Sequence, residues 1–232
     1  MSPVGHLPRR TLVKRSAIAE AATTLFLHHG FRATSMDDIA TTAGVSKVTL
    51  YKQFGDKRTL FETVVLGITD RAVTITAGIE ATLAGIDTAD QLEPALVDLA
   101  ISYTSAVVTP GVVRLRRLVL AEAERFPDLA AAYFDGAPRR ALDALAAGFG
   151  RLDERGLLTV PAPDTAATQF AYLVLGPLLD RALFRPGSRS RRAEVVAAAG
   201  AGVATFLAAY QSRTSSRSMP SSPLVKRSSA RR

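Results

Sequence analysis

Apolar residues recur at intervals of three and four along most of this chain, which is the period of an amphipathic helix. In residues 11–29, one face of such a helix carries Leu12, Ile18, Ala22, Leu25 and Phe26. A second stripe begins at Lys57 and continues to Ile75, and it predicts one long helix. No segment alternates apolar and polar residues for long, as a half-buried strand does. The pattern therefore predicts an all-α protein.

Capping residues and a glycine divide the region after residue 30 into two short helices. Ser35 and Asp38 have the spacing of a capping box, which predicts a helix over residues 36–43. Gly44 follows it, and a second short helix is expected over about residues 46–53. Two short helices joined by a glycine turn are typical of a helix-turn-helix motif.

Prolines and glycines mark further boundaries in the rest of the chain. Pro110, Pro127 and Pro138 are each expected in the first turn of a helix, with Gly136 separating the last two of these helices. Gly156 is expected to end the helix that Pro138 begins. The whole pattern predicts about ten helices.

The helix-turn-helix motif has a recognisable core and a polar outer face. Gly44 permits the left-handed backbone of the tight turn. The small core that fixes the angle between the two helices is predicted to consist of Ile39, Ala40, Val45 and Leu50. The second helix then presents to solvent Lys47, Val48, Thr49, Tyr51, Lys52 and Gln53.

The exposed residues suit contact with double-stranded DNA. The second helix of such a motif lies in the major groove and reads base edges from its N-terminal part. Lys47 is able to donate to a guanine edge or a phosphate, and Val48 and the Thr49 methyl group suit a thymine methyl group.

Four further residues are expected to contact the DNA backbone. Tyr51 and Lys52 are placed for phosphates, which position a protein without specifying a sequence. Ser35 and Lys57 begin the flanking helices, where backbone N–H groups and the helix dipole attract anions.

Net charge is concentrated at the two ends of the chain. The total is +8, of which residues 1–15 contribute +4 and residues 212–232 contribute +6, so the intervening residues carry −2. Basic arms of this kind commonly bind nucleic acid, and a solubilising tail is the alternative for residues 212–232.

Composition narrows the class of protein further. The 232 residues are 47% apolar, which is enough for a sizeable core, and the absence of cysteine excludes disulfides and cysteine-ligated metals. The first residues lack the apolar stretch of a secretory signal. The longest apolar runs, such as Leu173 to Leu179, are far shorter than the roughly 20 residues that span a bilayer. We expect a cytoplasmic protein without a membrane partner.

No catalytic or metal-binding constellation stands out. The histidines are His6 near the chain start and His28 and His29 at the end of the first helix, where a cation favours the helix dipole. Glu122 and Glu124 are two residues apart and do not share a helix face. We therefore predict that the chain is not an enzyme and holds no metal or cofactor.

The first quarter of the chain resembles the DNA-binding domain of the tetracycline-repressor (TetR) family. The resemblance rests on GF at residues 30–31, TSMDDIA at 34–40, AGVSKVTLYKQF at 43–54, and Lys57 followed by Leu60-Phe61. It implies that Tyr51 and Lys57 contact phosphates and that Lys47, Val48 and Thr49 read bases. A further base-reading position would fall on Asp37, where an acid suits a cytosine amine or only favours the helix N-terminus.

The second half is similar to C-terminal domains of regulators related to AcrR and AefR. The similar segments are LRRLVLAEAERFPDLAAAYFDGAPRR at residues 115–140 and GRLDERGLL at 150–158. The resemblance implies a small hydrophobic or amphipathic effector and a homodimer formed through the last two helices. Residues 193–209 are apolar on more than one face, which requires burial against a partner or in a central core.

Eight residues of the middle helices, most of them aromatic, are the candidates for a ligand pocket, with the core as the alternative for the aromatic ones. They are Tyr103, Leu118, Tyr133, Phe134, Phe149, Gln169, Phe170 and Tyr172.

The domain organisation follows from these patterns. We expect a disordered basic arm over residues 1–10, a helix-turn-helix domain over 11–56, a helical ligand-binding and dimerisation domain over 57–211, and a disordered basic tail over 212–232. The predicted function is that of a dimeric transcriptional regulator, a repressor released from its operator by a small molecule. The alternative is an architectural DNA-binding protein without an effector.

Overall fold

The computed structural model describes residues 9–69 and 72–212, and these residues form α-helices and one π-helix without a β-strand. The helices are α1 (Arg9–Ala33), α2 (Met36–Thr42), α3 (Lys47–Phe54), α4 (Lys57–Thr69), α5 (Ala72–Ala84), α6 (Ala89–Val107), α7 (Pro110–Glu122), α8 (Pro127–Phe134), the π-helix η1 (Asp135–Arg139), α9 (Arg140–Glu154), α10 (Pro163–Phe184) and α11 (Arg192–Tyr210). The predicted all-α fold is confirmed.

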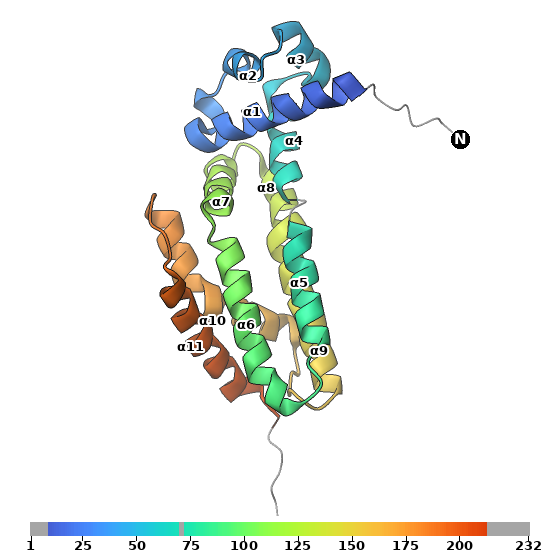
Figure 1. Ribbon diagram of the computed structural model, residues 1–232, viewed down its shortest axis with the longest axis vertical. Helices are drawn as coiled ribbons and strands as arrows, with labels where there is room; N and C mark the ends of the chain where they lie inside the picture. The colour runs from blue at the N-terminus through green and yellow to red at the C-terminus, as the bar shows by residue number, and fades with distance from the viewer. Residues whose placement is uncertain (1–8, 70–71, 213–232) are drawn as a thin grey trace, which may run out of the picture.

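The molecule is elongated, with a small bundle at one end and a larger one below it (Figure 1). Helices α1, α2 and α3 form the small bundle together with the start of α4, and α5 to α11 form the larger one. The predicted arm and tail lie mostly outside the described residues. Helix α1, however, already begins at Arg9, so Arg9 and Arg10 belong to the helix and not to the arm.

The long helix predicted from Lys57 to Ile75 corresponds to two helices, α4 and α5, on either side of residues 70–71, which lie outside the description. Helix α4 begins at an aspartate cap, because the Thr59 amide donates to Asp56 Oδ1 at 2.7 Å. Helix α5 extends to Ala84, beyond the end of the predicted stripe.

One hydrophobic cluster joins the small bundle to the larger one. Phe26 and Phe31 of the first helix contact Phe61 of α4, with ring centroids 5.2 and 4.9 Å apart. Phe61 in turn contacts Phe126, which precedes α8, at 5.5 Å. Buried side chains of α7 and α8 complete this cluster, so the core is continuous across the predicted domain boundary at residue 56.

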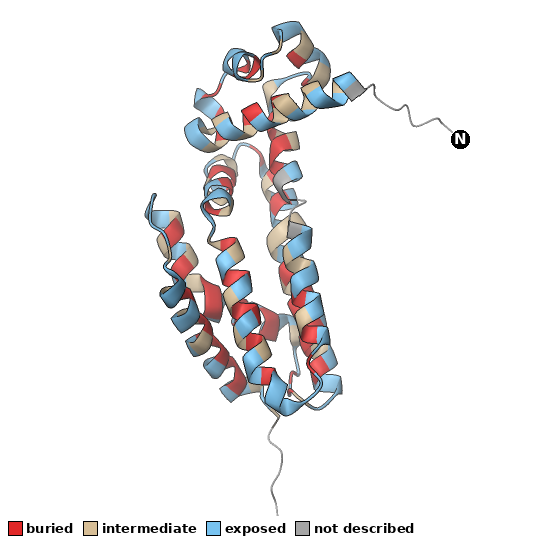
Figure 2. Ribbon diagram, in the orientation of Figure 1, coloured by how far each residue is buried: buried red, intermediate tan, exposed pale blue. Residues whose placement is uncertain are grey.

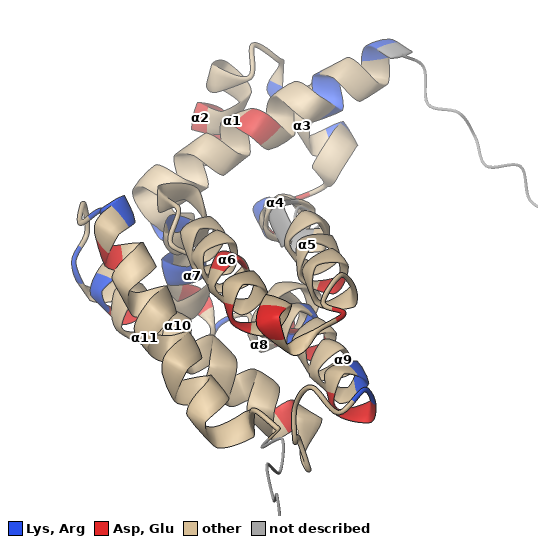
Figure 3. Cartoon of the chain, turned by 60° about the horizontal axis from the view of Figure 1, so that its bottom comes forward, with Lys and Arg blue, Asp and Glu red and all other residues tan. Residues whose placement is uncertain are grey.

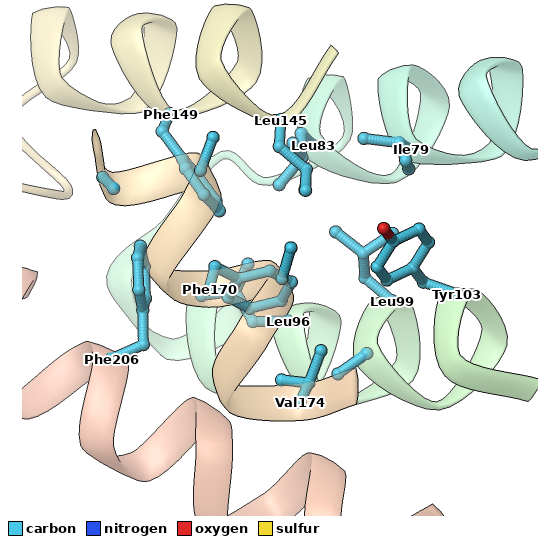
Figure 4. Close-up of a cluster of buried hydrophobic side chains, with 14 of the residues drawn as sticks. Ile79, Leu83, Leu96, Leu99, Tyr103, Leu145, Phe149, Phe170, Val174 and Phe206 are labelled. Atoms are coloured by element: carbon cyan, nitrogen blue, oxygen red, sulfur yellow. The ribbon is translucent and has the colours of Figure 1, made fainter. Parts of the chain in front are cut away.

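A second cluster fills the larger bundle, with buried residues from α5, α6, α9, α10 and α11. Figure 2 shows buried residues recurring along the helices of this bundle. Phe149, Phe170 and Phe206 lie at its centre on three different helices and contact one another at 4.8 to 5.4 Å (Figure 4). The contacts of Phe170 with Phe149 and with Phe206 are edge-to-face, and such contacts add to the free energy gained by burying apolar area.

The predicted break at Gly136 and the predicted helix start at Pro138 are wrong. The π-helix Asp135–Arg139 carries the chain from α8 into α9 without a turn. Pro138 has no N–H to donate to the preceding helical turn, and its ring would clash with a carbonyl group of that turn in an α-helix. The wider π-turn makes room for the proline ring, so the helix continues through this residue. Gly156 ends α9 as predicted, with φ of 71°.

Helices α10 and α11 pack unusually closely. A Cβ atom on Gly202 of α11 would lie 2.8 Å from Val174 Cγ1 and 3.0 Å from the Leu173 carbonyl group. In the described part of the chain, α11 is also the single unbroken helix whose length and composition match a membrane span, and a third of that span is buried. The core helix of a soluble protein can have the same length and composition, so these two properties do not by themselves identify a membrane span.

Candidate DNA-binding surface and ligand cavity

The turn between α2 and α3 has the geometry of a helix-turn-helix motif. Gly44 has φ of 64°, and the Val45 amide donates to the Ala40 carbonyl at 3.0 Å. Ile39, Ala40 and Leu50 are buried, and Val45 is half-buried against the same cluster. These four residues therefore belong to one buried cluster, which also includes residues of α1 and α4.

The outer face of α3 carries the predicted DNA-contacting residues. Val48 is 78% exposed and Tyr51 is 50% exposed, and Lys47 and Lys52 are also exposed. Thr49 is half-buried, and its hydroxyl lies 2.9 Å from Oγ of Ser46, the residue that caps α3. An exposed valine at the start of a short helix has no packing role, which leaves it free to contact a thymine methyl group.

Lys47 is held by an acid of the preceding helix. Its Nζ lies 2.6 Å from Asp37 Oδ2, and the hydrogen bond and charge of Asp37 raise the pKa of Lys47. Asp37 is in the first turn of α2, so its carboxylate also faces the positive end of that helix dipole. The carboxylate thus connects the two helices of the motif.

Ser35 takes part in the predicted capping box. Its hydroxyl donates to Asp38 Oδ2 at 2.6 Å and accepts from the Asp38 amide at 3.0 Å, and its own amide donates to the same carboxylate at 3.3 Å. These hydrogen bonds lower the pKa of Asp38.

Lys57 is half-buried at the start of α4. Its ammonium donates to the Arg32 carbonyl at 3.3 Å and lies 4.5 Å from the Phe31 ring centroid. Burial, followed by the charge of Arg125, lowers the pKa of Lys57. The side chain therefore joins the end of α1 to α4 and leaves its remaining N–H groups for an anion.

Arg15 is a positioning residue that the sequence pattern did not single out beyond its charge. Its Nη1 donates to the Gln53 carbonyl at 2.8 Å, and its guanidinium lies 4.4 Å from the Phe54 ring centroid. It thereby fixes the C-terminal end of α3 to α1. Figure 3 shows basic residues on the N-terminal part of α1 and on α3, the two elements that Arg15 connects.

A cavity of about 340 Å³ lies between the small bundle and the larger one. Thr23 and Leu27 of α1 form one wall. The other walls come from α5, α6, α7, α8, η1 and α9, and include Tyr103, Arg116 and Tyr133. A smaller cavity of about 200 Å³ between α5 and α6 shares Ile75 and Tyr103 with it. The larger of these two volumes lies within the range of pockets that accommodate small organic ligands.

Tyr103 and Tyr133 are the predicted pocket residues that line the larger cavity, and the other predicted residues do not. Phe149 and Phe170 are fully buried in the core of the larger bundle, and Leu118 is buried in the cluster around Phe61. Helical spacing places these side chains on an inward face, but it does not distinguish a filled core from a cavity.

The remaining predicted pocket residues face outward. Phe134 and Tyr172 are 48% and 69% exposed. Gln169 is also exposed and accepts a hydrogen bond from the Tyr210 hydroxyl at 2.6 Å, which joins α10 to the end of α11.

The fold and the exposed face of α3 define a helix-turn-helix regulator, and comparison with known proteins identifies its family. Residues 18–64 match the model of bacterial regulatory proteins of the tetR family. Residues 94–212 match the model of the AefR-like transcriptional repressor C-terminal domain. The chain belongs to the TetR family, and the predicted resemblance is confirmed. No match was found among curated proteins.

Solved structures agree with this assignment. A TetR-family transcriptional regulator from Mesorhizobium loti is 34% identical, covers 88% of this chain and 100% of its own, and superposes with a TM-score of 0.80. The flavonoid-responsive regulator FrrA is 32% identical over 86% of this chain and 98% of its own, with a TM-score of 0.63. SmeT, the repressor of a multidrug efflux pump of Stenotrophomonas maltophilia, is 24% identical over 85% of this chain and 90% of its own, with a TM-score of 0.56.

Membership in the family establishes the class of function. The protein is a DNA-binding transcriptional regulator of the repressor class, and the family is regulatory and not enzymatic. Regulators of this family bind operator DNA and act as dimers.

Proposed function

We propose that this protein is a homodimeric repressor that leaves its operator when a small molecule occupies the cavity between its two bundles. The observation that carries this proposal is the position of α1, which contributes Thr23 and Leu27 to the cavity wall and also holds α3 through Arg15. A ligand in the cavity would therefore contact the same rigid helix that positions the DNA-binding surface.

The DNA-binding part of the proposal rests on the exposed residues of α3. Val48 and Lys47 would read base edges, with Thr49 beside them, while Tyr51 and Lys52 would contact phosphates. Ser35 and Lys57 flank this surface at the starts of α2 and α4. In a two-fold dimer the two α3 helices would enter major grooves one helical turn apart, about 34–36 Å.

The coupling between cavity and DNA follows from the length of α1. About twelve residues separate Arg15 from Leu27, which is about 18 Å along a helix. A small tilt of α1 at the cavity would therefore move α3 through the Arg15–Gln53 hydrogen bond. A ligand shifts the dimer away from the DNA-binding geometry only to the extent that it binds the other geometry better.

Dimerisation is proposed through α10 and α11. The outward faces of these helices expose Tyr172, Leu173, Phe184 and Val196. The remainder of the outward face of α11 is largely alanine. Exposed apolar residues on two adjacent helices suit a self-complementary interface, in which each chain contributes half of a four-helix bundle.

The first experiment is DNA binding without any ligand. The purified protein is titrated with the DNA that flanks its own gene and with random DNA of equal length, at two salt concentrations. A Val48→Ala, Tyr51→Ala variant is compared with Leu120→Ala, which changes an apolar residue that is 61% exposed on α7. Preference for the flanking DNA that only the double variant loses supports groove reading by α3.

Equal binding to both DNAs with a steep salt dependence would instead support the architectural alternative. Sedimentation of the protein at several concentrations tests the dimer separately. A monomer in solution and on DNA would contradict the proposed interface.

A further inference from the structure

The described polar side chains that line the larger cavity include a positive charge but no negative one. They include the Arg116 guanidinium and the hydroxyls of Tyr103 and Tyr133, and no aspartate or glutamate lines the cavity. The hydroxyls of Thr23 and Thr109 are already used, because they donate to the carbonyls of Ala19 and Ala106. The groups left over are one cation and two phenols, all of which can donate.

Arg116 differs from the two arginines beside it. Arg114 donates to the Pro110 carbonyl at 3.2 Å, and Arg117 donates to the Ala182 carbonyl at 2.5 Å. Within residues 9–69 and 72–212, the Arg116 side chain has neither a hydrogen-bond partner nor an ion pair, although it is half-buried. A guanidinium in such a place gains most from a carboxylate, which accepts two of its N–H groups side by side.

The two tyrosines are similarly without protein partners. Tyr103 and Tyr133 are 8% and 7% exposed, and neither hydroxyl forms a hydrogen bond with any described residue. Burial raises the pKa of Tyr103, while the nearby charge of Arg116 opposes that shift. Buried tyrosine hydroxyls usually have a partner, so these two hydroxyls are available for a molecule in the cavity.

We propose that the effector of this protein is a compact aromatic anion whose acidic group pairs with Arg116. This inference rests on the proposed function, since it names the chemical class of the ligand for the same cavity. The aromatic part would lie among the apolar lining residues Leu27, Val107 and Leu115, and the tyrosine hydroxyls would donate to the acidic group or to a ring substituent.

The proposal also specifies how the ligand would act on the DNA-binding end. Arg116 lies on α7, whereas Thr23 and Leu27 lie on α1, and the two helices pack against each other beside the cavity. A molecule fixed by its acid to α7 and in contact with α1 would set the separation of these helices. The acidic group of the ligand would then be as important for releasing the protein from DNA as for the affinity of the protein for the ligand.

The test uses three probes of one shape and different charge: 2-naphthoate, 2-naphthamide and 2-naphthylmethylammonium. Calorimetric titration into the full-length protein without DNA measures the dissociation constant of each probe. We expect 2-naphthoate to bind at least tenfold more tightly than the amide, which corresponds to about 1.4 kcal/mol, and the cation to bind most weakly.

Two variants separate the role of Arg116 from a general charge effect. In Arg116→Gln, the affinity for 2-naphthoate should fall to that for the amide. Arg114→Gln is the control, because it removes the same charge from an exposed residue two positions away. The affinity of this variant for 2-naphthoate should equal that of the parent protein. Circular dichroism and thermal melting of both variants establish that they are folded.

Three results would overturn the proposal: equal binding of the amide and the acid, loss of the preference for the acid in both variants, or no binding of any probe to the folded protein. None of these results depends on operator binding, which the DNA titration measures alone. Failure of the ligand class and failure of the proposed regulator are therefore distinguished.

Discussion

The ammonium group of Lys47 lies 2.6 Å from the carboxylate of Asp37, and this ion pair joins the first turn of α3 to the first turn of α2. Both side chains are about 60% exposed, at 63% and 60%, so solvent screens the pair and its effect on stability is small. The ion pair matters mainly for DNA binding. It cancels the charge of the lysine nearest the start of the recognition helix, and it limits the directions in which that lysine points.

Asp37→Asn should therefore strengthen binding to random DNA more than binding to the operator. Freed from its partner, Lys47 of each subunit becomes available to a phosphate, and the slope of log K against log salt should steepen by about 0.9 per subunit, or about 1.8 for the proposed dimer. Titrations at four or more salt concentrations measure this slope. Asp90→Asn, which removes an exposed acid from the first turn of α6, is the matched control. An unchanged slope in Asp37→Asn would show that Lys47 does not reach a phosphate.

Arg15→Gln should weaken operator binding while leaving the protein folded. The substitution removes the hydrogen bond to the Gln53 carbonyl and the stacking on Phe54, so α3 is less well fixed against α1. Arg15→Lys should rescue little, because an ammonium group cannot stack as a planar guanidinium does. Arg10→Gln removes an exposed charge from the same helix and controls for electrostatics.

The distinguishing measurement is the salt slope of operator binding for the two variants. A loss in Arg15→Gln that is equal at all salt concentrations supports positioning, whereas a shallower slope would mean that Arg15 contacts a phosphate directly.

Gly202→Ala should destabilise the protein, although alanine is normally better than glycine in a helix. Its Cβ would meet Val174 Cγ1 at 2.8 Å and the Leu173 backbone at 3.0 Å, and overpacking of this kind costs about 1–3 kcal/mol. Gly78→Ala in α5 is the control, since no atom lies within 4 Å of its added Cβ. That variant should be about 0.5–1 kcal/mol more stable than the parent. Urea unfolding of the three proteins measures both effects, and a stabilised Gly202→Ala would contradict the close packing of α10 on α11.

The folded protein should lose stability in acid, because three carboxylates that accept hydrogen bonds in the folded state become protonated. Hydrogen bonds from Ser35 lower the pKa of Asp38, those from Thr59 lower the pKa of Asp56, and Arg181 lowers the pKa of Glu194. A lowered folded-state pKa means that the stabilisation is present above the unfolded-state pKa and is lost as the pH falls through the folded-state value. We therefore expect the melting temperature to decline below about pH 4, the ordinary range of these groups.

Carboxyl chemical shifts followed by NMR against pH locate each titration. Ser35→Ala removes the hydroxyl that donates to Asp38, so it should raise the pKa of Asp38 and leave that of Asp56 unchanged. An Asp38 titration that does not move would contradict the importance of this hydrogen bond.

Local patterns of the chain were sufficient to predict the helix-turn-helix motif. Gly44 adopts the positive φ of the turn, Ser35 and Asp38 form the capping box, and Leu50 lies on the buried face of α3. Each of these features depends only on residues that are close in sequence. The same holds for Pro110 and Pro127, which begin helices as predicted, and for Gly156, which ends one.

The cavity was decided by tertiary structure alone. Tyr103, Phe149 and Phe170 have the same helical signal in the sequence, yet Tyr103 lines a cavity while the two phenylalanines fill the core beside Phe206. Whether a buried face meets another side chain or an empty volume depends on how distant helices pack. For the same reason, only the tertiary structure shows that Arg15 fixes α3 to α1 and that Arg116 is the lone cation of the cavity lining among the described residues.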